Sequence, residues 1–157
     1  MRWLTLGLLF AAACDAGLVD PNPTTGFTQD ELPTFASGAF GPLAGYQGIG
    51  GAGGMARQFD GTTDLYLNVG GVTPDTIFTA HLHVAPCAAN AGGHYKIDPA
   101  ITQTIESNEL WLRGRSTPVG TLFALQSFAH RTRADAASIV VHDPVTGAKM
   151  ACADLEE

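Results

Sequence analysis

Apolar and polar positions alternate through the middle of the chain with the period of a β-strand. Leu65, Leu67 and Val69 alternate with polar neighbours, so residues 64–69 predict a strand with two different faces. Residues 70–75 (GGVTPD) have the composition of a turn. In the next strand, Phe78, Ala80, Leu82 and Val84 form an apolar face, and the opposite face carries His81 and His83.

Further strands are predicted at residues 110–115, 121–129, 138–143 and 148–154, because no helical period extends beyond about two turns. Short strands separated by turns favour an all-β fold, a Greek-key β-barrel or sandwich, over residues 34–157. Residues 41–54 are rich in glycine but lack the Lys-Ser/Thr ending of a phosphate loop. We interpret them as a turn or linker between strands.

The N-terminus has the pattern of an export signal. Arg2 precedes the uncharged residues 3–13, and three alanines then lead directly to Cys14. That run is too short to cross a bilayer as a helix, so residues 1–13 predict a signal peptide. The Ala-Ala-Ala-Cys junction resembles the lipobox of bacterial lipoproteins, in which the cysteine is lipidated, although Ala11 stands where leucine is usual. The alternative is an ordinary leader that is cut nearby. Residues 14–33 predict a flexible tether.

The net charge and the cysteine content narrow the range of possible protein classes further. Eight Lys and Arg against 15 Asp and Glu give a net charge of −7 in 157 residues, which excludes a nucleic-acid binder. An exported domain folds where disulfides persist. If Cys14 is lipidated, Cys87 and Cys152 remain, and a bond between them would contribute roughly 4 kcal/mol to stability. The alternative is two buried free thiols.

The histidines are the candidate chemistry. His81 and His83 share one strand face, with their bases roughly 7 Å apart, close enough to hold one ion together. His94 follows a loop, and His142 ends a predicted strand. A site made only of imidazoles suits copper or zinc.

These elements occur in a recognisable order: Ala80-His81-Leu82-His83, Cys87, Gly92-Gly93-His94-Tyr95, Ile139-Val140-Val141-His142 and Lys149-Met150-Ala151-Cys152. The order resembles that of the copper/zinc superoxide dismutase family, over roughly residues 55–155. The resemblance implies an all-β, Greek-key barrel of about eight strands. It implies four copper ligands, His81, His83, His94 and His142, of which His94 would bridge to zinc. It also implies the Cys87–Cys152 disulfide.

Three departures from that family stand out. No histidine lies between His94 and Leu110, so the zinc ligands are missing and zinc binding is doubtful. Only nine residues separate His142 from Cys152, so the site would lack a long covering loop. Lys149 occupies the position of the family's anion-guiding arginine and keeps the charge without the planar fork. The missing zinc ligands and the short loop together resemble the copper-only members of the family.

The resemblance therefore implies an exported copper enzyme that disproportionates superoxide to oxygen and hydrogen peroxide. Catalysis would depend on Lys149, which attracts the anion, and on His94, which could carry a proton. The alternatives are a copper-binding or copper-buffering lipoprotein on the same fold, and a structural domain with a degenerate site. The expected location is the cell envelope or periplasm, with a lipid anchor in a bacterial membrane. A homodimer is one option for its assembly.

Four other residues receive expectations. Asp98 and Glu109 could each hold the outer nitrogen of His94, or could be solvated carboxylates. Trp111 is expected to pack in the barrel, and His130, which matches no ligand of the family, is expected at the surface at the end of a strand.

Overall fold

The computed structural model describes residues 32–157. The predicted signal peptide, most of the tether and the lipidation candidate Cys14 lie outside the described residues. The described chain forms eight strands and two short 3-10 helices: β1 (Thr34–Pro42), β2 (Gly50–Arg57), β3 (Thr63–Gly70), β4 (Ile77–His83), η2 (Cys87–Ala89), η3 (Glu106–Asn108), β5 (Trp111–Arg115), β6 (Thr121–Phe128), β7 (Ser138–His142) and β8 (Lys149–Asp154). No helix in this part is long and apolar enough to cross a membrane.

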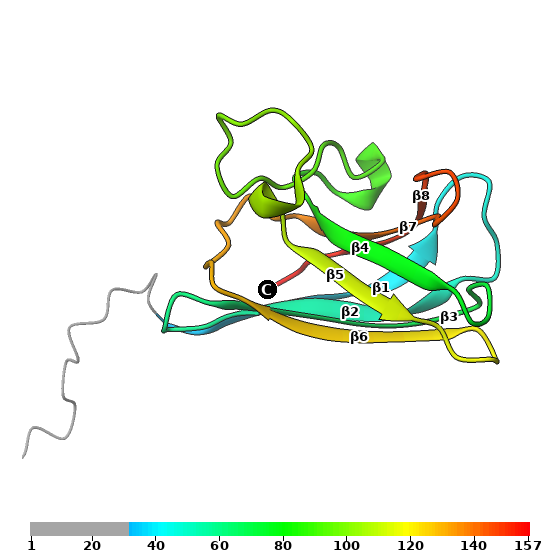
Figure 1. Ribbon diagram of the computed structural model, residues 1–157. Helices are drawn as coiled ribbons and strands as arrows, with labels where there is room; N and C mark the ends of the chain where they lie inside the picture. Colours follow the sequence, from blue (N-terminus) through cyan, green and yellow to red (C-terminus); the bar gives the residue numbers. More distant parts are fainter. Residues whose placement is uncertain (1–31) are drawn as a thin grey trace, which may run out of the picture.

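The strands run antiparallel in the order β5-β4-β7-β8-β1-β2-β3-β6 and form a nearly closed barrel (Figure 1). One wall consists of β5, β4, β7 and β8, and the other of β1, β2, β3 and β6. The walls are joined on one side where Gly41 and Pro42 of β1 pair with β8. On the other side, an isolated bridge joins Ser116, which directly follows β5, to Leu122 of β6. The all-β barrel predicted from the alternating pattern is confirmed.

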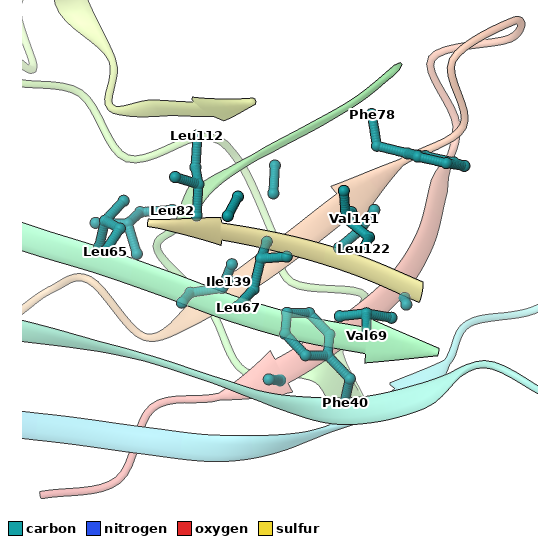
Figure 2. Close-up of a cluster of buried hydrophobic side chains, with 14 of the residues drawn as sticks. Phe40, Leu65, Leu67, Val69, Phe78, Leu82, Leu112, Leu122, Ile139 and Val141 are labelled. Carbon is teal, nitrogen blue, oxygen red and sulfur yellow. The ribbon is translucent and has the colours of Figure 1, made fainter. Parts of the chain in front are cut away.

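The core fills the space between the two walls (Figure 2). Leu65, Leu67 and Val69 of β3 are at most 1% exposed, as are Phe78 and Leu82 of β4. Burying each of these side chains contributes about 1.5–3 kcal/mol. This inner face leaves the alternate positions of β4 on the outside of the barrel wall, and those positions carry His81 and His83. The core therefore anchors the strand that presents the histidines.

Two details of the prediction were wrong. The glycine-rich segment is not only a linker, because Gly50–Gly54 lie inside β2. Close packing explains this: a Cβ on Gly54 would lie 2.7 Å from the Tyr66 ring, and one on Gly53 would lie 2.6 Å from the Phe40 ring. The strand uses glycine so that neighbouring aromatic rings can cover it. Val84, expected on the core face, is 42% exposed because β4 ends at His83.

Candidate metal centre

Two neighbouring strands place three of the predicted ligands on one outer patch of the barrel. His81 and His83 alternate with core residues on β4, and β7 pairs with β4 so that His142 lies opposite Thr79. The β7–β8 register is interrupted between Val141 and His142, at the end of β7. Irregularities of this kind commonly re-aim a side chain near a functional site.

The fourth predicted ligand, His94, reaches the patch because the loop after β4 folds back on itself. Tyr95 N–H donates to the Leu82 carbonyl, and His94 forms a bridge with His83. The turn uses three successive left-handed residues, Asn90, Ala91 and Gly92, with φ of 52°, 58° and 60°. Such angles are uncommon for the non-glycine members, so packing of the loop must hold them. This return of the chain brings His94 against its partners on the sheet.

All four histidines converge. One ring nitrogen from each of His81, His83, His94 and His142 can be chosen so that these atoms all lie within 4.8 Å of one another. The His81 ring centroid lies 4.1 Å from that of His94 and 4.3 Å from that of His142. His81 and His83 are 4% and 0% exposed, although they lie on the outer side of the wall. Loops therefore cover the histidines that the pattern placed away from the core.

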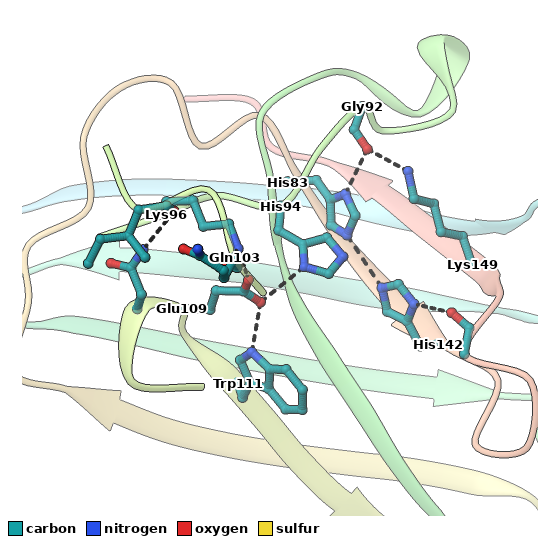
Figure 3. Close-up of polar contacts among 12 residues, drawn as sticks. His83, Gly92, His94, Lys96, Gln103, Glu109, Trp111, His142 and Lys149 are labelled. Atoms are coloured by element: carbon teal, nitrogen blue, oxygen red, sulfur yellow. Dashed lines mark hydrogen bonds and ion pairs between the residues drawn. The ribbon is translucent and has the colours of Figure 1, made fainter. Parts of the chain in front are cut away.

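The hydrogen bonds of three rings fix which nitrogen faces the cluster. The Nδ1 of His83 donates to the Gly92 carbonyl (3.3 Å), and the Nδ1 of His142 donates to the Gly147 carbonyl (2.9 Å), because a carbonyl only accepts. The Nδ1 of His94 lies 3.0 Å from Glu109 Oε2. Each of these rings is thereby left with an Nε2 lone pair as a possible ligand. Figure 3 shows these contacts.

Several ring nitrogens of the cluster have no hydrogen-bond donor, an arrangement that favours a bound cation. The Nε2 atoms of His83 and His142 lie 3.4 Å apart, and in the tautomers above both are acceptors. Among residues 32–157, His81 Nδ1 is the one buried side-chain nitrogen or oxygen without a hydrogen-bond partner. Buried polar atoms are nearly always satisfied. Three Nε2 lone pairs, together with a converging nitrogen of His81, thus form a donor set that fits a metal ion such as copper or zinc.

Burial also favours the neutral form of three of these imidazoles, those of His81, His83 and His142. It lowers the pKa of His81 to about 2 and that of His83 to about 3, and neighbouring imidazoles add to the effect. The pKa of His142 is lowered as well, mainly by burial. Neutral imidazole is the form that binds metals, so these three histidines are in the metal-binding form at neutral pH.

The carboxylate that meets His94 is Glu109. Its side chain is fully buried, and it accepts hydrogen bonds from His94 Nδ1, from the Lys96 ammonium and from Trp111 Nε1. Asp98, the other candidate, instead accepts from the backbone N–H of Ala100 through its carboxylate and does not contact His94. Such carboxylate–imidazole pairs orient metal-binding histidines.

Trp111 was misplaced by the sequence analysis. It does not pack in the barrel core but stacks on the ring of His81, with centroids 5.5 Å apart and planes 19° apart. The signal for this position was present, because Trp111 follows the buried Leu110 and precedes the buried Leu112, so it must face outward. His130 lies apart from the cluster and contacts Tyr95 Oη at 3.0 Å.

Lys149 lies at the rim of the site. Its ammonium donates to the carbonyls of Asn90 (2.7 Å) and Gly92 (2.5 Å), and Lys149, Asn90, His94 and His142 line a common hollow. An ammonium has three N–H groups, so one remains for an anion. The structure also forms the Cys87–Cys152 disulfide, which ties the loop after β4 to β8.

The comparisons with known proteins agree with this architecture. No protein-family model matches the sequence, and no curated protein matches it by sequence. Among solved structures, the chain is similar to Candida albicans superoxide dismutase 5 in its Cu(II) form, with a TM-score of 0.56 and 16% identity over 79% of this chain and 92% of that one. The chain is also similar to a variant of that enzyme in which a glutamate is replaced by glutamine, with a TM-score of 0.56 and 15% identity over 79% of this chain and 91% of that one. For the variant with alanine at the same glutamate, the TM-score is 0.52 and the identity 15%, over 79% of this chain and 89% of that one. The fold is superoxide dismutase-like.

Proposed function

We propose that the protein is an exported copper-dependent superoxide dismutase that binds one copper ion through His81, His83, His94 and His142. The observation that carries the proposal is the donor set: three Nε2 atoms fixed by their outer hydrogen bonds and a converging nitrogen of His81. Similarity of the fold to a copper-containing superoxide dismutase supports the choice of metal. Fold alone does not establish activity.

Copper held in this cluster would supply the one-electron exchange that disproportionation of superoxide requires. The protein's part is to admit the anion and to manage protons. Lys149 places a positive charge and a free N–H at the rim, against a chain that is otherwise net negative. Glu109 retains the proton on Nδ1 of His94, so Nε2 is the atom of this ring that can take up and release a proton.

Glu109 also bears on zinc. Both of its carboxylate oxygens are already engaged, with Lys96 on Oε1 and with His94 and Trp111 on Oε2. The outer nitrogen of His94, which a bridging zinc would need, faces this carboxylate. These contacts support a copper-only centre in which Glu109 orients His94.

The test is a copper titration of the purified protein and of His83→Ala. We expect one copper per wild-type chain, a Cu(II) electron paramagnetic resonance spectrum with three or four nitrogen donors, and loss of stoichiometric binding in the variant. His130→Ala, which changes a histidine outside the cluster, serves as the control and should bind normally. Full copper occupancy in His83→Ala would contradict the site.

A superoxide-decay assay on the copper-loaded protein separates the enzyme from the second candidate, a copper-binding or copper-buffering lipoprotein. The shortness of the β7–β8 connection favours that candidate, because only residues 143–148 join these strands and little chain is left to guide a substrate. Copper binding without accelerated decay would establish the second candidate.

We also propose that the chain is exported and anchored through a lipidated Cys14. The disulfide supports export, because such bonds persist in oxidising compartments. Expression in a bacterium followed by mass spectrometry should find the mature chain beginning at a diacylated Cys14. A Cys14→Ser variant should leave the membrane fraction, and an unmodified cysteine would refute the anchor.

A further inference from the structure

The side chain of Trp111 contacts the ring of His81 and also the carboxylate of Glu109, which is hydrogen-bonded to His94. Trp111 begins β5 and pairs with His81 of β4 in the sheet register. Its indole ring stacks on the His81 ring, and the Arg113 guanidinium lies 5.0 Å from the indole centroid. The ring therefore restricts how the His81 imidazole can tilt, and His81 is the ring whose Nδ1 has no partner.

The indole N–H acts on a second histidine. Trp111 Nε1 donates to Glu109 Oε2 at 2.8 Å, and the same oxygen accepts from His94 Nδ1 at 3.0 Å. Glu109 is fully buried, so its partners come from the protein rather than from bulk water. Two donors on Oε2 and Lys96 on Oε1 leave the carboxylate little freedom to rotate (Figure 3). Without the indole N–H, Oε2 would be held by His94 alone.

We propose that Trp111 is a positioning residue of the candidate copper centre: its ring sets the plane of His81, and its N–H holds Glu109 in the orientation that fixes His94. Indole is suited to both tasks because it combines a large aromatic face with a single donor and no acceptor. The inference rests on the proposed function for its copper readouts, but the coupling from Trp111 to His94 exists without metal.

The coupling is therefore tested first in the metal-free full-length protein. Trp111→Phe keeps an aromatic face and removes the N–H. In the nuclear magnetic resonance spectrum, we expect the His94 Nδ1–H proton of the wild type to be protected from solvent exchange and to lose at least tenfold of that protection in the variant. Arg113→Gln is the matched control, since it removes the guanidinium that lies near the indole ring but leaves the hydrogen bond from Trp111 Nε1 to Glu109 in place. An unchanged His94 signal in folded Trp111→Phe would overturn the proposal.

The second readout is copper itself. Changing an outer partner of a metal ligand typically weakens metal binding 10–100-fold, so we expect Trp111→Phe to bind Cu(II) at least tenfold more weakly in a competition titration. Its Cu(II) resonance parameters should shift, and those of Arg113→Gln should not. Affinity and spectrum equal to wild type would refute the positioning role.

Two arrangements keep the outcome decisive. If Trp111→Phe does not fold, benzothienylalanine at position 111 retains both rings and replaces only the N–H by sulfur. It should weaken the His94 Nδ1–H protection in the same way.

If the wild type binds no copper while the metal-free coupling is lost in the variant, the proposed function fails but the Trp111–Glu109–His94 linkage stands. Normal wild-type copper binding with no effect of the variant contradicts only the role of Trp111.

Discussion

At the scale of single residues, the site is a set of imidazoles whose chemistry is set by their outer partners. In His83, His94 and His142, Nδ1 is hydrogen-bonded to an oxygen atom of the protein, so Nε2 is the nitrogen left free to bind a metal. His81 has no such partner, and its Nδ1 is buried without a hydrogen bond. The histidines thus differ in role even though they are identical in type, and only His94 is oriented by a carboxylate.

The lowered pKa values of His81 and His83 predict how the metal-free protein responds to acid. In the unfolded chain these histidines titrate near 6.5, whereas in the folded state their pKa values are about 2 and 3. Between these values the unfolded chain binds more protons, so the free energy of unfolding falls as pH drops from about 6.5 towards 3. Each histidine contributes about 1.4 kcal/mol per pH unit over that interval.

Urea unfolding of the metal-free protein from pH 7 to pH 4 measures this loss. His81→Gln should flatten the dependence by about one proton, whereas the control His130→Gln should flatten it less, since His130 is farther from full burial. A stability that stays constant from pH 7 to pH 4 would contradict the assignment of neutral, buried imidazoles.

At the scale of elements, the disulfide and the loop after β4 connect the core to the site. Cys87 of η2 is bonded to Cys152 of β8, and the loop continues to Gly92, whose carbonyl accepts from both His83 and Lys149. The bond therefore restrains the backbone that orients one ligand. Because the two cysteines are 65 positions apart in the sequence, the bond also reduces the entropy of the unfolded chain.

Replacing both cysteines by serine should lower the free energy of unfolding by about 4 kcal/mol, from the loop-closure entropy. The same variant should bind copper more weakly, because Gly92 is less firmly placed. Chemical denaturation and a copper competition titration measure the two effects. Stability equal to wild type, or a copper affinity that ignores the missing bond, would show that the loop is held by its other contacts.

The crossing of β1 and β8 gives a second element-scale prediction. A Cβ on Gly38 would lie 1.8 Å from the backbone oxygen of Asp154, whereas a Cβ on Gly41 would meet nothing within 4 Å. Gly38→Ala must push β8 away from β1, and we expect a loss of about 1–3 kcal/mol, the usual cost of overpacking. Gly41→Ala is the matched control on the same strand and should be near neutral in thermal unfolding. Equal stabilities for the two variants would refute the close approach.

At the scale of the whole molecule, the proposed activity requires a negatively charged chain to attract an anion to one place on its surface. The net charge of −7 repels superoxide in general, and Lys149 is the cation at the rim of the histidine cluster. Local charge in a hollow can outweigh the net charge at short range, within a Debye length of about 10 Å at 0.1 M salt. Because salt screens both the general repulsion and the local attraction by Lys149, the salt dependence of the rate reports how much these charges contribute.

Lys149→Ala should slow superoxide consumption at low salt and flatten its salt dependence, because the attractive charge is gone. Lys149→Arg keeps the charge and should retain most of the salt response. Lys149 also holds two loop carbonyls, so a rate difference that persists at high salt reports that structural role, measured in the same stopped-flow series. An unchanged rate at low salt would remove Lys149 from the mechanism.

The sequence by itself determined the barrel and the identity of the clustered histidines. Strand alternation is local, because side chains separated by two residues always share a face, so Leu65, Leu67 and Val69 identify a strand without further context. The same rule placed His81 and His83 together, and the order of motifs added His94 and His142.

Only the tertiary structure decided what surrounds those histidines. The burial of His81 and His83 depends on loops that are distant in sequence, and Trp111 reaches His81 only because β5 lies beside β4. The strand formed by Gly50–Gly54 likewise depends on rings supplied by Phe40 and Tyr66. Periodicity describes one strand at a time, whereas contacts across strands depend on which strands pair and in which register, and that is settled when the barrel closes.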